Sequence, residues 1–435
     1  MLKRLFITLS LLLFAITVAN GQTGVWSGKL DIQGTKLPLV FHLDDEKPTM
    51  DSPNQGAKGI PIKVSHTDSG KVRIEIPSIN AQYEGVWLIN SIVGRFTQMG
   101  ASLPLTLTPG DDRPNRPQTP KQPFPYSTEE VSFTNGDFTL NGTLTTPANY
   151  TRSTPVVIMV TGSGKQNRDE ELFDHKPFAV IADALARAGF ASLRYDDRGF
   201  GDKSINILNY TTEDFKGDAL AGIALLRTRF DNIGVLGHSE GGTIAMMLAA
   251  EEQVEFAISL AGMIISGAET LVWQNKVTLK LAGVDNTIVE AYSKLLKEAF
   301  EATTHGHNAP NPDDYHIPQS LIENYWAVTG MLKMPYMAHF VTLDMRPLLD
   351  RISCPVLALN GTKDSQVEYS SNLEALRNGL AANPKHRIEA IEALNHLFQH
   401  CTTGSVTEYN TIEESFAPEA LDMIIQWLYS LTTQQ

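Results

Sequence analysis

One short segment, GVLGHSEGG, holds Ser239 between closely spaced glycines, in a pattern that can present a nucleophile. A run typical of a buried strand, NIGVLG, ends in this segment, and a run typical of a helix, GGTIAMMLAA, follows Glu240. The G-x-S-x-G spacing between a strand and a helix predicts a sharp turn that holds the serine hydroxyl above the edge of a sheet. We therefore predict that Ser239 is a nucleophile; the alternative is a chance match in a glycine-rich turn.

A serine hydroxyl is a weak nucleophile and needs a base within hydrogen-bonding distance. Asp364 follows the strand-like run PVLALN, and His396 follows the strand-like run HRIEAIEAL. Because the carboxyl ends of parallel strands meet at one edge of a sheet, we expect both side chains near Ser239, in the chain order nucleophile, acid, histidine. Weaker candidates, which precede their strands or lie further along a loop, are Asp350, His386 and His400.

The negative charge that develops on an attacked carbonyl oxygen needs backbone N–H donors. We predict that Glu240, the residue after the serine, provides one donor and that Ser163, in the segment TGSGKQNRDE, provides the other. Gly162 and Gly164, on either side of Ser163, allow a close approach of the backbone. The segment lacks the GxxxxGK[ST] spacing of a phosphate-binding loop, which argues against a nucleotide ligand.

Two charged segments, RDEELFD and RYDDRGFGDKS, contain polar residues that could line the pocket or brace its loops. Besides the two glycines above, the residues predicted for this role are Arg168, Asp169, Glu170, Asp197 and Arg198. The alternatives are the solvated start of a helix for the first segment and a glycine-rich turn with local ion pairs for the second.

The second part of the chain alternates between strand-like and helix-like runs, which predicts a parallel sheet built from right-handed crossovers. The run TPVVIMVTG is continuously apolar, as in a strand buried on both faces. A hairpin with NGD at its turn opens this part. The alternation covers residues 127–263 and 350–435, and we interpret the helical block between them, residues 264–349, as a cap over the carboxyl edge of the sheet.

The N-terminal part predicts a second, smaller domain. Residues 22–108 contain short β-like runs between turn residues, and one of them, KVRIEI, alternates strictly between charged and apolar residues. We expect a small antiparallel β domain that supports the rest or presents substrate, because it has no cluster of catalytic residue types. Residues 109–126 contain six prolines, which excludes a helix and predicts an extended linker.

The first residues resemble a targeting segment. Lys3 and Arg4 precede an apolar run, and small residues follow at the spacing of a cleavage site, so residues 1–21 are predicted to be a signal peptide. The alternative is a membrane anchor, but the run is short for a transmembrane helix. We expect a protein exported to the periplasm or the cell exterior, with no stable membrane anchor.

Composition narrows the possible partners of this 435-residue chain. Its formal net charge of −14 argues against nucleic acid, because a polyanion would be repelled. With 42% hydrophobic and 19% charged residues, the chain is typical of a globular protein. The two cysteines, Cys354 and Cys401, are too few for a disulfide framework, and their pairing stays open. Neither lies at a metal-ligand spacing, so we expect no metal site.

The segments GHSEGG, TGSGKQNRDE, RYDDRGFGDKS, GTKDSQV and NHLFQ together resemble the α/β-hydrolase superfamily, and within it exported bacterial carboxylesterases. The N-terminal segments DSPNQGAKGIP and YEGVWLINSIVGRFTQMGASLPLTL also match that group, so the resemblance covers nearly all of the chain after residue 21. It implies an α/β-hydrolase fold with a mostly parallel central sheet, an inserted helical cap and a small N-terminal antiparallel β domain. It also implies Ser239 as nucleophile, Asp364 as acid and His396 as base. Relatives often have Pro and Asp where this chain has Lys165 and Asn167, which alters the local charge of the pocket.

These observations predict an exported serine hydrolase that needs no cofactor and cleaves a small-molecule or glycan-linked ester, with short acyl chains implied by the resemblance. Two alternatives stay open. Some relatives are named serine aminopeptidases, and Glu170, Glu171 or an acid of the cap could then bind a substrate ammonium group. A non-catalytic glycan-binding or scaffold protein is the other. The sequence does not predict the natural acyl group, the alcohol or the oligomeric state.

Overall fold

The computed structural model describes residues 24–32, 35–43, 46–66, 70–88, 90–111 and 114–432. The chain divides into two compact units, residues 1–115 and residues 116–435. The predicted signal peptide, residues 1–21, lies outside the described residues. Among the helices of the described ranges, none is both long and apolar enough to cross a membrane.

The first unit is an antiparallel sheet with the strand order β4-β3-β2-β1-β9-β8-β7-β6-β5. The alternation in KVRIEI places Val72, Ile74 and Ile76 in the apolar core and turns Lys71 and Arg73 outward. The elements are β1 (Val25–Ile32), β2 (Thr35–His42), β3 (Thr49–Ser52), η1 (Pro53–Gln55), β4 (Ala57–Pro61), β5 (Lys63–His66), β6 (Lys71–Ile76), η2 (Pro77–Ile79), β7 (Ala81–Trp87), β8 (Ile92–Gln98) and β9 (Ala101–Pro109). The strands β3, β4 and β5 are only four or five residues long, and β4 itself contains Gly59 and Pro61, so they carry little periodicity.

The central sheet of the second unit has the strand order β10-β11-β13-β12-β14-β15-β16-β17. Its strands are β10 (Tyr126–Asn135), β11 (Phe138–Pro147), β12 (Val156–Val160), β13 (Ala191–Tyr195), β14 (Ile233–His238), β15 (Phe256–Leu260), β16 (Val356–Gly361) and β17 (Arg387–Ile391). Neighbouring strands are parallel from β13 to β17, whereas β10 pairs with β11 and β11 with β13 in antiparallel fashion. The sheet is therefore mixed, and the expectation of a mostly parallel sheet holds only for the segment from β13 to β17.

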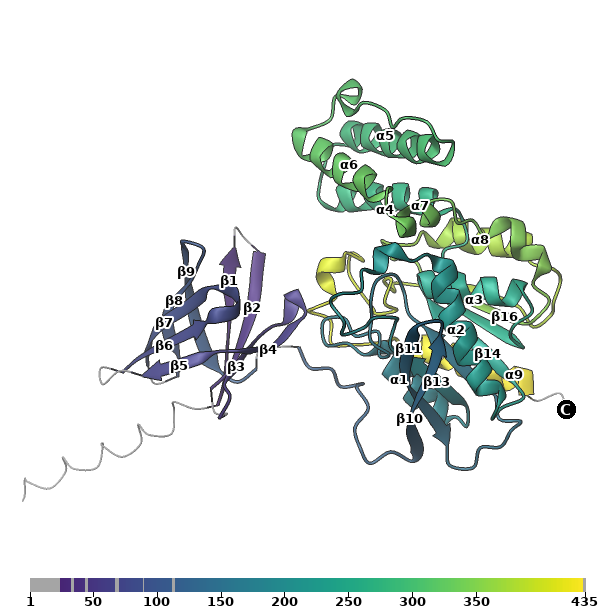
Figure 1. The fold of residues 1–435 in the computed structure, drawn as a ribbon, viewed down its shortest axis with the longest axis horizontal. Coiled ribbons are helices and arrows are strands. Elements are labelled where there is room, and N and C mark those ends of the chain that lie inside the picture. The colour runs from purple at the N-terminus through teal and green to yellow at the C-terminus, as the bar shows by residue number, and fades with distance from the viewer. Residues whose placement is uncertain are drawn as a thin grey trace, which may run out of the picture. The chain divides into compact units, whose positions relative to one another are not determined.

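Helices cover both faces of this sheet (Figure 1). In β12, Val156 and Ile158 pack on the side of α2, α3 and α8, and Val157 and Met159 pack on the side of α1 and α9. This explains why the strand is apolar at every position. The helices are α1 (Pro177–Arg187), η3 (Ile207–Asn209), α2 (Thr212–Arg227), α3 (Glu240–Ala250), η5 (Arg346–Arg351), α8 (Tyr369–Gly379), η6 (Val406–Glu408) and α9 (Pro418–Thr432).

A group of helices is inserted between β15 and β16, drawn in green in Figure 1. Its elements are α4 (Gly267–Leu281), α5 (Asn286–Thr304), η4 (Pro312–Tyr315), α6 (Gln319–Met331) and α7 (Pro335–Phe340). Val289, Tyr292, Leu296 and Phe300 form an apolar stripe along α5, and the last three of them belong to the core of this cap. The Asn372 side chain of α8 accepts the backbone N–H groups at the start of the insertion.

The proline-rich segment is partly fixed to the second unit. Arg116 donates to the backbone carbonyl oxygens of Phe173, Asn410 and Ile412. The amide of Gln118 donates to the Phe416 carbonyl oxygen at 2.7 Å. The part of the predicted linker from Arg116 onward therefore packs on the second unit.

Candidate active site

Ser239 lies between β14 and α3 in a strained backbone conformation, with φ 54° and ψ −120°. Glycine is required at positions 237 and 241, because other backbone atoms lie where a side chain would begin. A Cβ on Gly237 would lie 1.8 Å from the Gly241 carbonyl oxygen, and a Cβ on Gly241 would lie 2.1 Å from the Val160 carbonyl oxygen. Because both neighbours are packed this tightly, the turn holds Ser239 in the geometry of a nucleophile elbow.

This strain predicts that a glycine at position 239 gives a more stable protein than an alanine does. Glycine adopts this conformation without steric cost but loses more backbone entropy on folding, so we expect Ser239→Gly to be about 1 kcal/mol more stable than Ser239→Ala. Urea unfolding of the two variants side by side measures the difference. A Ser239→Gly variant that is no more stable than Ser239→Ala would contradict a strain larger than the entropic cost of glycine.

Asp364 and His396 form a buried pair at the carboxyl edge of the sheet. His396 Nδ1 lies 2.8 Å from Asp364 Oδ2, and both residues are almost inaccessible to solvent. The other oxygen, Asp364 Oδ1, accepts the backbone N–H groups of Gln366 at 2.7 Å and Val367 at 2.9 Å. Since Nδ1 faces the acid, Nε2 is the ring nitrogen that can take a proton from a nucleophile.

His238, the residue before Ser239, connects three parts of the site. Its Nε2 donates to the backbone carbonyl oxygen of His396 at 2.8 Å, and the two imidazole rings lie 4.7 Å apart. Its Nδ1 lies 2.9 Å from Glu170 Oε1, which also accepts the Gly162 N–H at 2.8 Å. A buried chain of hydrogen bonds therefore joins the Gly162 loop, the serine turn and the His396 loop.

The Glu170–His238 pair carries a pH-dependent contribution to stability. Burial lowers the pKa of His238, but the Glu170 carboxylate and the hydrogen bonds to Glu170 and His396 raise it more, so the net pKa is raised. A pKa raised on folding gives stability that is complete below the unfolded value of about 6.5 and is lost as the pH rises through the folded value.

We therefore expect Glu170→Gln to lower the free energy of unfolding by about 2 kcal/mol at pH 6 and by less at pH 9. Urea unfolding of wild type and variant at both pH values measures this. The neighbouring acid provides the control, since Glu171→Gln affects a partly exposed contact with Lys176 and should cost less than about 1 kcal/mol at either pH. An equal or larger loss for Glu170→Gln at pH 9 would contradict a charged pair.

The two predicted oxyanion donors lie next to each other. A Cβ on Gly162 would lie 3.1 Å from the Ser239 Cβ, so the loop that carries Ser163 borders the serine directly. Ser163 Oγ donates to Glu240 Oε2 at 2.7 Å. Within the described ranges, no protein acceptor takes the backbone N–H of Ser163 or of Glu240. Both N–H groups are therefore available to a substrate oxygen, and that of Glu240 lies at the positive end of the α3 dipole.

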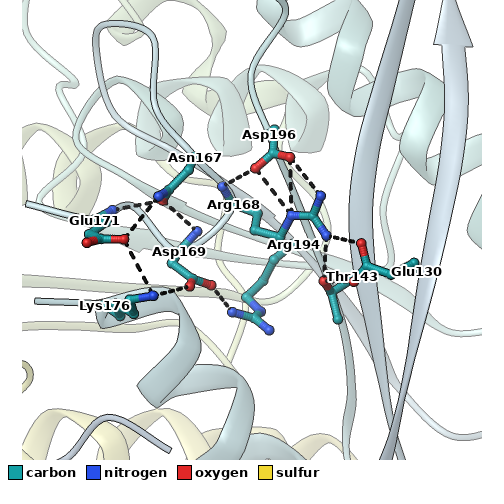
Figure 2. Close-up of polar contacts among 9 residues, drawn as sticks. All are labelled: Glu130, Thr143, Asn167, Arg168, Asp169, Glu171, Lys176, Arg194 and Asp196. Atoms are coloured by element: carbon teal, nitrogen blue, oxygen red, sulfur yellow. Dashed lines mark hydrogen bonds and ion pairs between the residues drawn. The ribbon is translucent and has the colours of Figure 1, made fainter. Parts of the chain in front are cut away.

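Ion pairs brace the loop that follows β12, as Figure 2 shows. Asp196 accepts the backbone N–H of Arg168 at 2.8 Å and the Arg168 guanidinium at 2.7 Å. The same guanidinium donates to Glu130 at 2.5 Å. Asp169 pairs with Arg194 and lies 3.4 Å from Lys176 Nζ. Arg168 and Asp169 thus fix the loop to strands β10 and β13 and to the start of α1.

Asp197 and Arg198 lie in different surroundings although they are adjacent in sequence. Asp197 accepts Thr161 Oγ1 and the Gln166 N–H, both at 2.7 Å, so it holds the Ser163 loop. Burial raises the pKa of Asp197 to about 8. The buried Arg198 instead pairs with Asp218 of α2 at 2.7 Å.

Comparison with models of protein families identifies the family to which the chain belongs. The family model described as alpha/beta hydrolase fold matches residues 155–400, which is more than half of the chain. The chain belongs to this α/β-hydrolase family. The match includes Ser239, Asp364 and His396 and the whole helical insertion.

This α/β-hydrolase is similar in sequence to one esterase and in fold to solved structures. Esterase EstD from Thermotoga maritima is 25% identical over 279 residues, which cover 63% of this chain and 62% of EstD. The match thus spans less than two thirds of that relative. Est1E from Butyrivibrio proteoclasticus covers 69% of this chain and 99% of its own, with 18% identity and a TM-score of 0.40. The match to a proline iminopeptidase from Mycobacterium smegmatis covers 69% of this chain and 98% of the iminopeptidase, with 16% identity and a TM-score of 0.44. Because both TM-scores lie below 0.5, neither structure bears on the reaction.

The weaker candidates have other partners in this α/β-hydrolase. His386, the residue before β17, accepts the Val356 N–H at 3.1 Å. His400 is half exposed and pairs with Glu414 and Glu419, both at 2.9 Å. Cys354 and Cys401 are free thiols. Among the described residues, no cluster of three or more side chains could hold a metal ion.

Three residues of the site, His238, Thr212 and Tyr336, have no sequence signal that marks their role. His238 precedes Ser239 in the serine motif, and nothing in the local sequence indicates that it binds the His396 carbonyl oxygen. Thr212 and Tyr336 both donate to the Glu240 carboxylate. They lie in α2 and α7, remote in sequence from the serine, so no local pattern marks them.

Proposed function

We propose that this α/β-hydrolase is a serine hydrolase that cleaves carboxylic esters with short acyl chains through an acyl-enzyme intermediate. The observation that carries the proposal is the buried Asp364–His396 pair at the sheet edge where Ser239 occupies its strained turn. The similarity to EstD supports an ester as the substrate class.

In the first half of the reaction, Ser239 Oγ attacks the ester carbonyl carbon while His396 Nε2 takes the hydroxyl proton. Asp364 holds the ring with Nδ1 protonated and stabilises the imidazolium. The backbone N–H groups of Glu240 and Ser163 bind the oxyanion of the tetrahedral intermediate. His396 then gives its proton to the leaving alcohol, and the acyl group stays on Ser239.

In the second half, a water molecule gives a proton to His396 Nε2 and attacks the acyl carbon. The tetrahedral intermediate collapses, the carboxylic acid leaves, and the proton returns to Ser239 Oγ. No cofactor is needed in either half.

The acids near Ser239 favour an ester over an aminoacyl substrate. A substrate ammonium group would need a carboxylate that is not already engaged. Glu170 accepts the Gly162 N–H and pairs with His238, and Glu240 accepts three hydroxyl groups. Glu171 accepts the Asn167 amide and faces Lys176. We therefore propose that this enzyme acts on small-molecule or glycan-linked esters.

A substrate panel tests this function. Purified protein is expected to hydrolyse p-nitrophenyl acetate and butyrate faster than p-nitrophenyl decanoate, and to leave aminoacyl-p-nitroanilides intact. Turnover of the anilides with little turnover of the esters would favour a serine aminopeptidase. Hydrolysis of neither class would contradict the proposed function.

A further inference from the structure

The Glu240 side chain is a meeting point of three elements. Its carboxylate is buried and accepts Ser163 Oγ at 2.7 Å, Thr212 Oγ1 at 2.7 Å and Tyr336 Oη at 2.5 Å. Ser163 belongs to the loop after β12, Thr212 to the first turn of α2, and Tyr336 to α7 of the cap. One carboxylate therefore links the cap to the residue that follows the nucleophile.

Tyr336 is held as a donor to this carboxylate. Its ring packs against Phe215 of α2 and Phe340 of α7, with centroid distances of 6.1 and 5.7 Å. Burial, followed by the Glu240 carboxylate, raises the pKa of Tyr336 well above its usual value. The hydroxyl thus stays protonated, and it shares Glu240 Oε2 with the Ser163 hydroxyl.

A small cavity of about 20 Å³ borders Glu240, Gly162 and Gly164, which is room for about one water molecule. The side chain could turn toward this space if a hydrogen bond were lost. Because Glu240 and Ser163 are the two proposed oxyanion donors, such a turn would disturb both of them.

The carboxylate also has an electrostatic effect on the reaction. An unscreened negative charge on Glu240 would repel the oxyanion that forms beside its own N–H group. Three hydroxyl dipoles point their positive ends at this charge, which reduces the repulsion.

We propose that Tyr336 is a positioning residue: through the Glu240 carboxylate, it sets the oxyanion donors, so that the hole is complete only when the cap is seated on the sheet domain. The inference rests on the proposed function, since it concerns the same oxyanion. It assigns to the cap a part in the chemical step besides substrate selection.

The test compares Tyr336→Phe with Tyr325→Phe, a matched control in the cap. Each change removes one tyrosine hydroxyl that donates a hydrogen bond, and Tyr325 donates to the Pro310 carbonyl oxygen at 2.7 Å, without contact with Glu240. The measurements are kcat and KM for p-nitrophenyl acetate and the inhibition constant of a trifluoromethyl ketone, which forms a tetrahedral oxyanion with the serine. A transition-state analogue of this kind reports the oxyanion interaction separately from substrate binding.

For Tyr336→Phe we expect kcat to fall about tenfold, the inhibition constant to rise by a similar factor, and KM to stay within about twofold. Tyr325→Phe should leave all three values unchanged. Ser163→Ala, which removes another hydroxyl from the same carboxylate, should show the Tyr336→Phe pattern and serves if the latter does not fold.

Several results would overturn the inference. An unchanged kcat and inhibition constant in Tyr336→Phe and Ser163→Ala would do so, as would equal losses in the Tyr325→Phe control or a change in KM alone. In each case an active wild type would leave the proposed function standing. An inactive wild type that binds no ketone would instead remove the proposed function and this inference with it.

Discussion

Ser239→Ala is expected to lower kcat for p-nitrophenyl acetate by roughly 10⁵-fold or more, because no other group can take over the attack on the carbonyl carbon. The residual rate should come from the oxyanion donors and from substrate binding alone. The variant should fold like the wild type, since Ser239 makes its contacts to α3 and β15 through backbone groups. Steady-state kinetics at high enzyme concentration measures the loss.

The control for this prediction is a serine of the same unit that lies away from the site. Ser370 is exposed on α8 and donates to the nearby Glu368 at 2.8 Å. Ser370→Ala should keep wild-type kcat. If Ser239→Ala retained more than about a hundredth of wild-type kcat, a different residue would have to be the nucleophile.

Asp364→Asn is expected to lower kcat by roughly 10⁴-fold with little change in the fold. Asp364 Oδ1 accepts two backbone N–H groups, so an asparagine must keep its carbonyl oxygen there and turn its NH₂ group toward His396. His396 Nδ1 would then accept a hydrogen bond, and the ring proton would move to Nε2. That nitrogen could no longer take the proton of Ser239.

Kinetics of Asp364→Asn and Asp350→Asn side by side check this prediction. Asp350 is the exposed acid before β16, a weaker candidate because it precedes its strand, and its variant should retain wild-type activity. A small loss of kcat in Asp364→Asn together with a large loss in Asp350→Asn would show that Asp350, and not Asp364, is the acid.

Local patterns predicted those parts of the fold and site that depend on neighbouring residues. The apolar run VVIMV forms a strand that is buried on both faces, and the glycines around Ser239 form a turn where a Cβ would clash. Asp364 and His396 follow their strands, so chain order alone places them at one edge of the sheet. In each case the signal lies within a few residues of the feature.

Contacts between distant segments could not be predicted in this way. Tyr336 meets Glu240 only because the cap folds over the sheet edge. The sequence of its own helix, α7, indicates only an apolar face that packs. The Glu170 carboxylate could equally have been a solvated acid at a helix start, but it is buried against His238. The short strands β3 to β5 lie among turn residues, which hide their periodicity. The signal peptide and the preference for short acyl chains remain predictions.

The most direct test of the central claim is peptide mapping by mass spectrometry after reaction with a fluorophosphonate, which phosphonylates an activated serine. One adduct is expected on the peptide that contains Ser239, formed as ester hydrolysis is lost, and no adduct is expected in Ser239→Ala. Loss of hydrolysis with the adduct on another residue, or an active enzyme whose Ser239 stays unmodified, would contradict it.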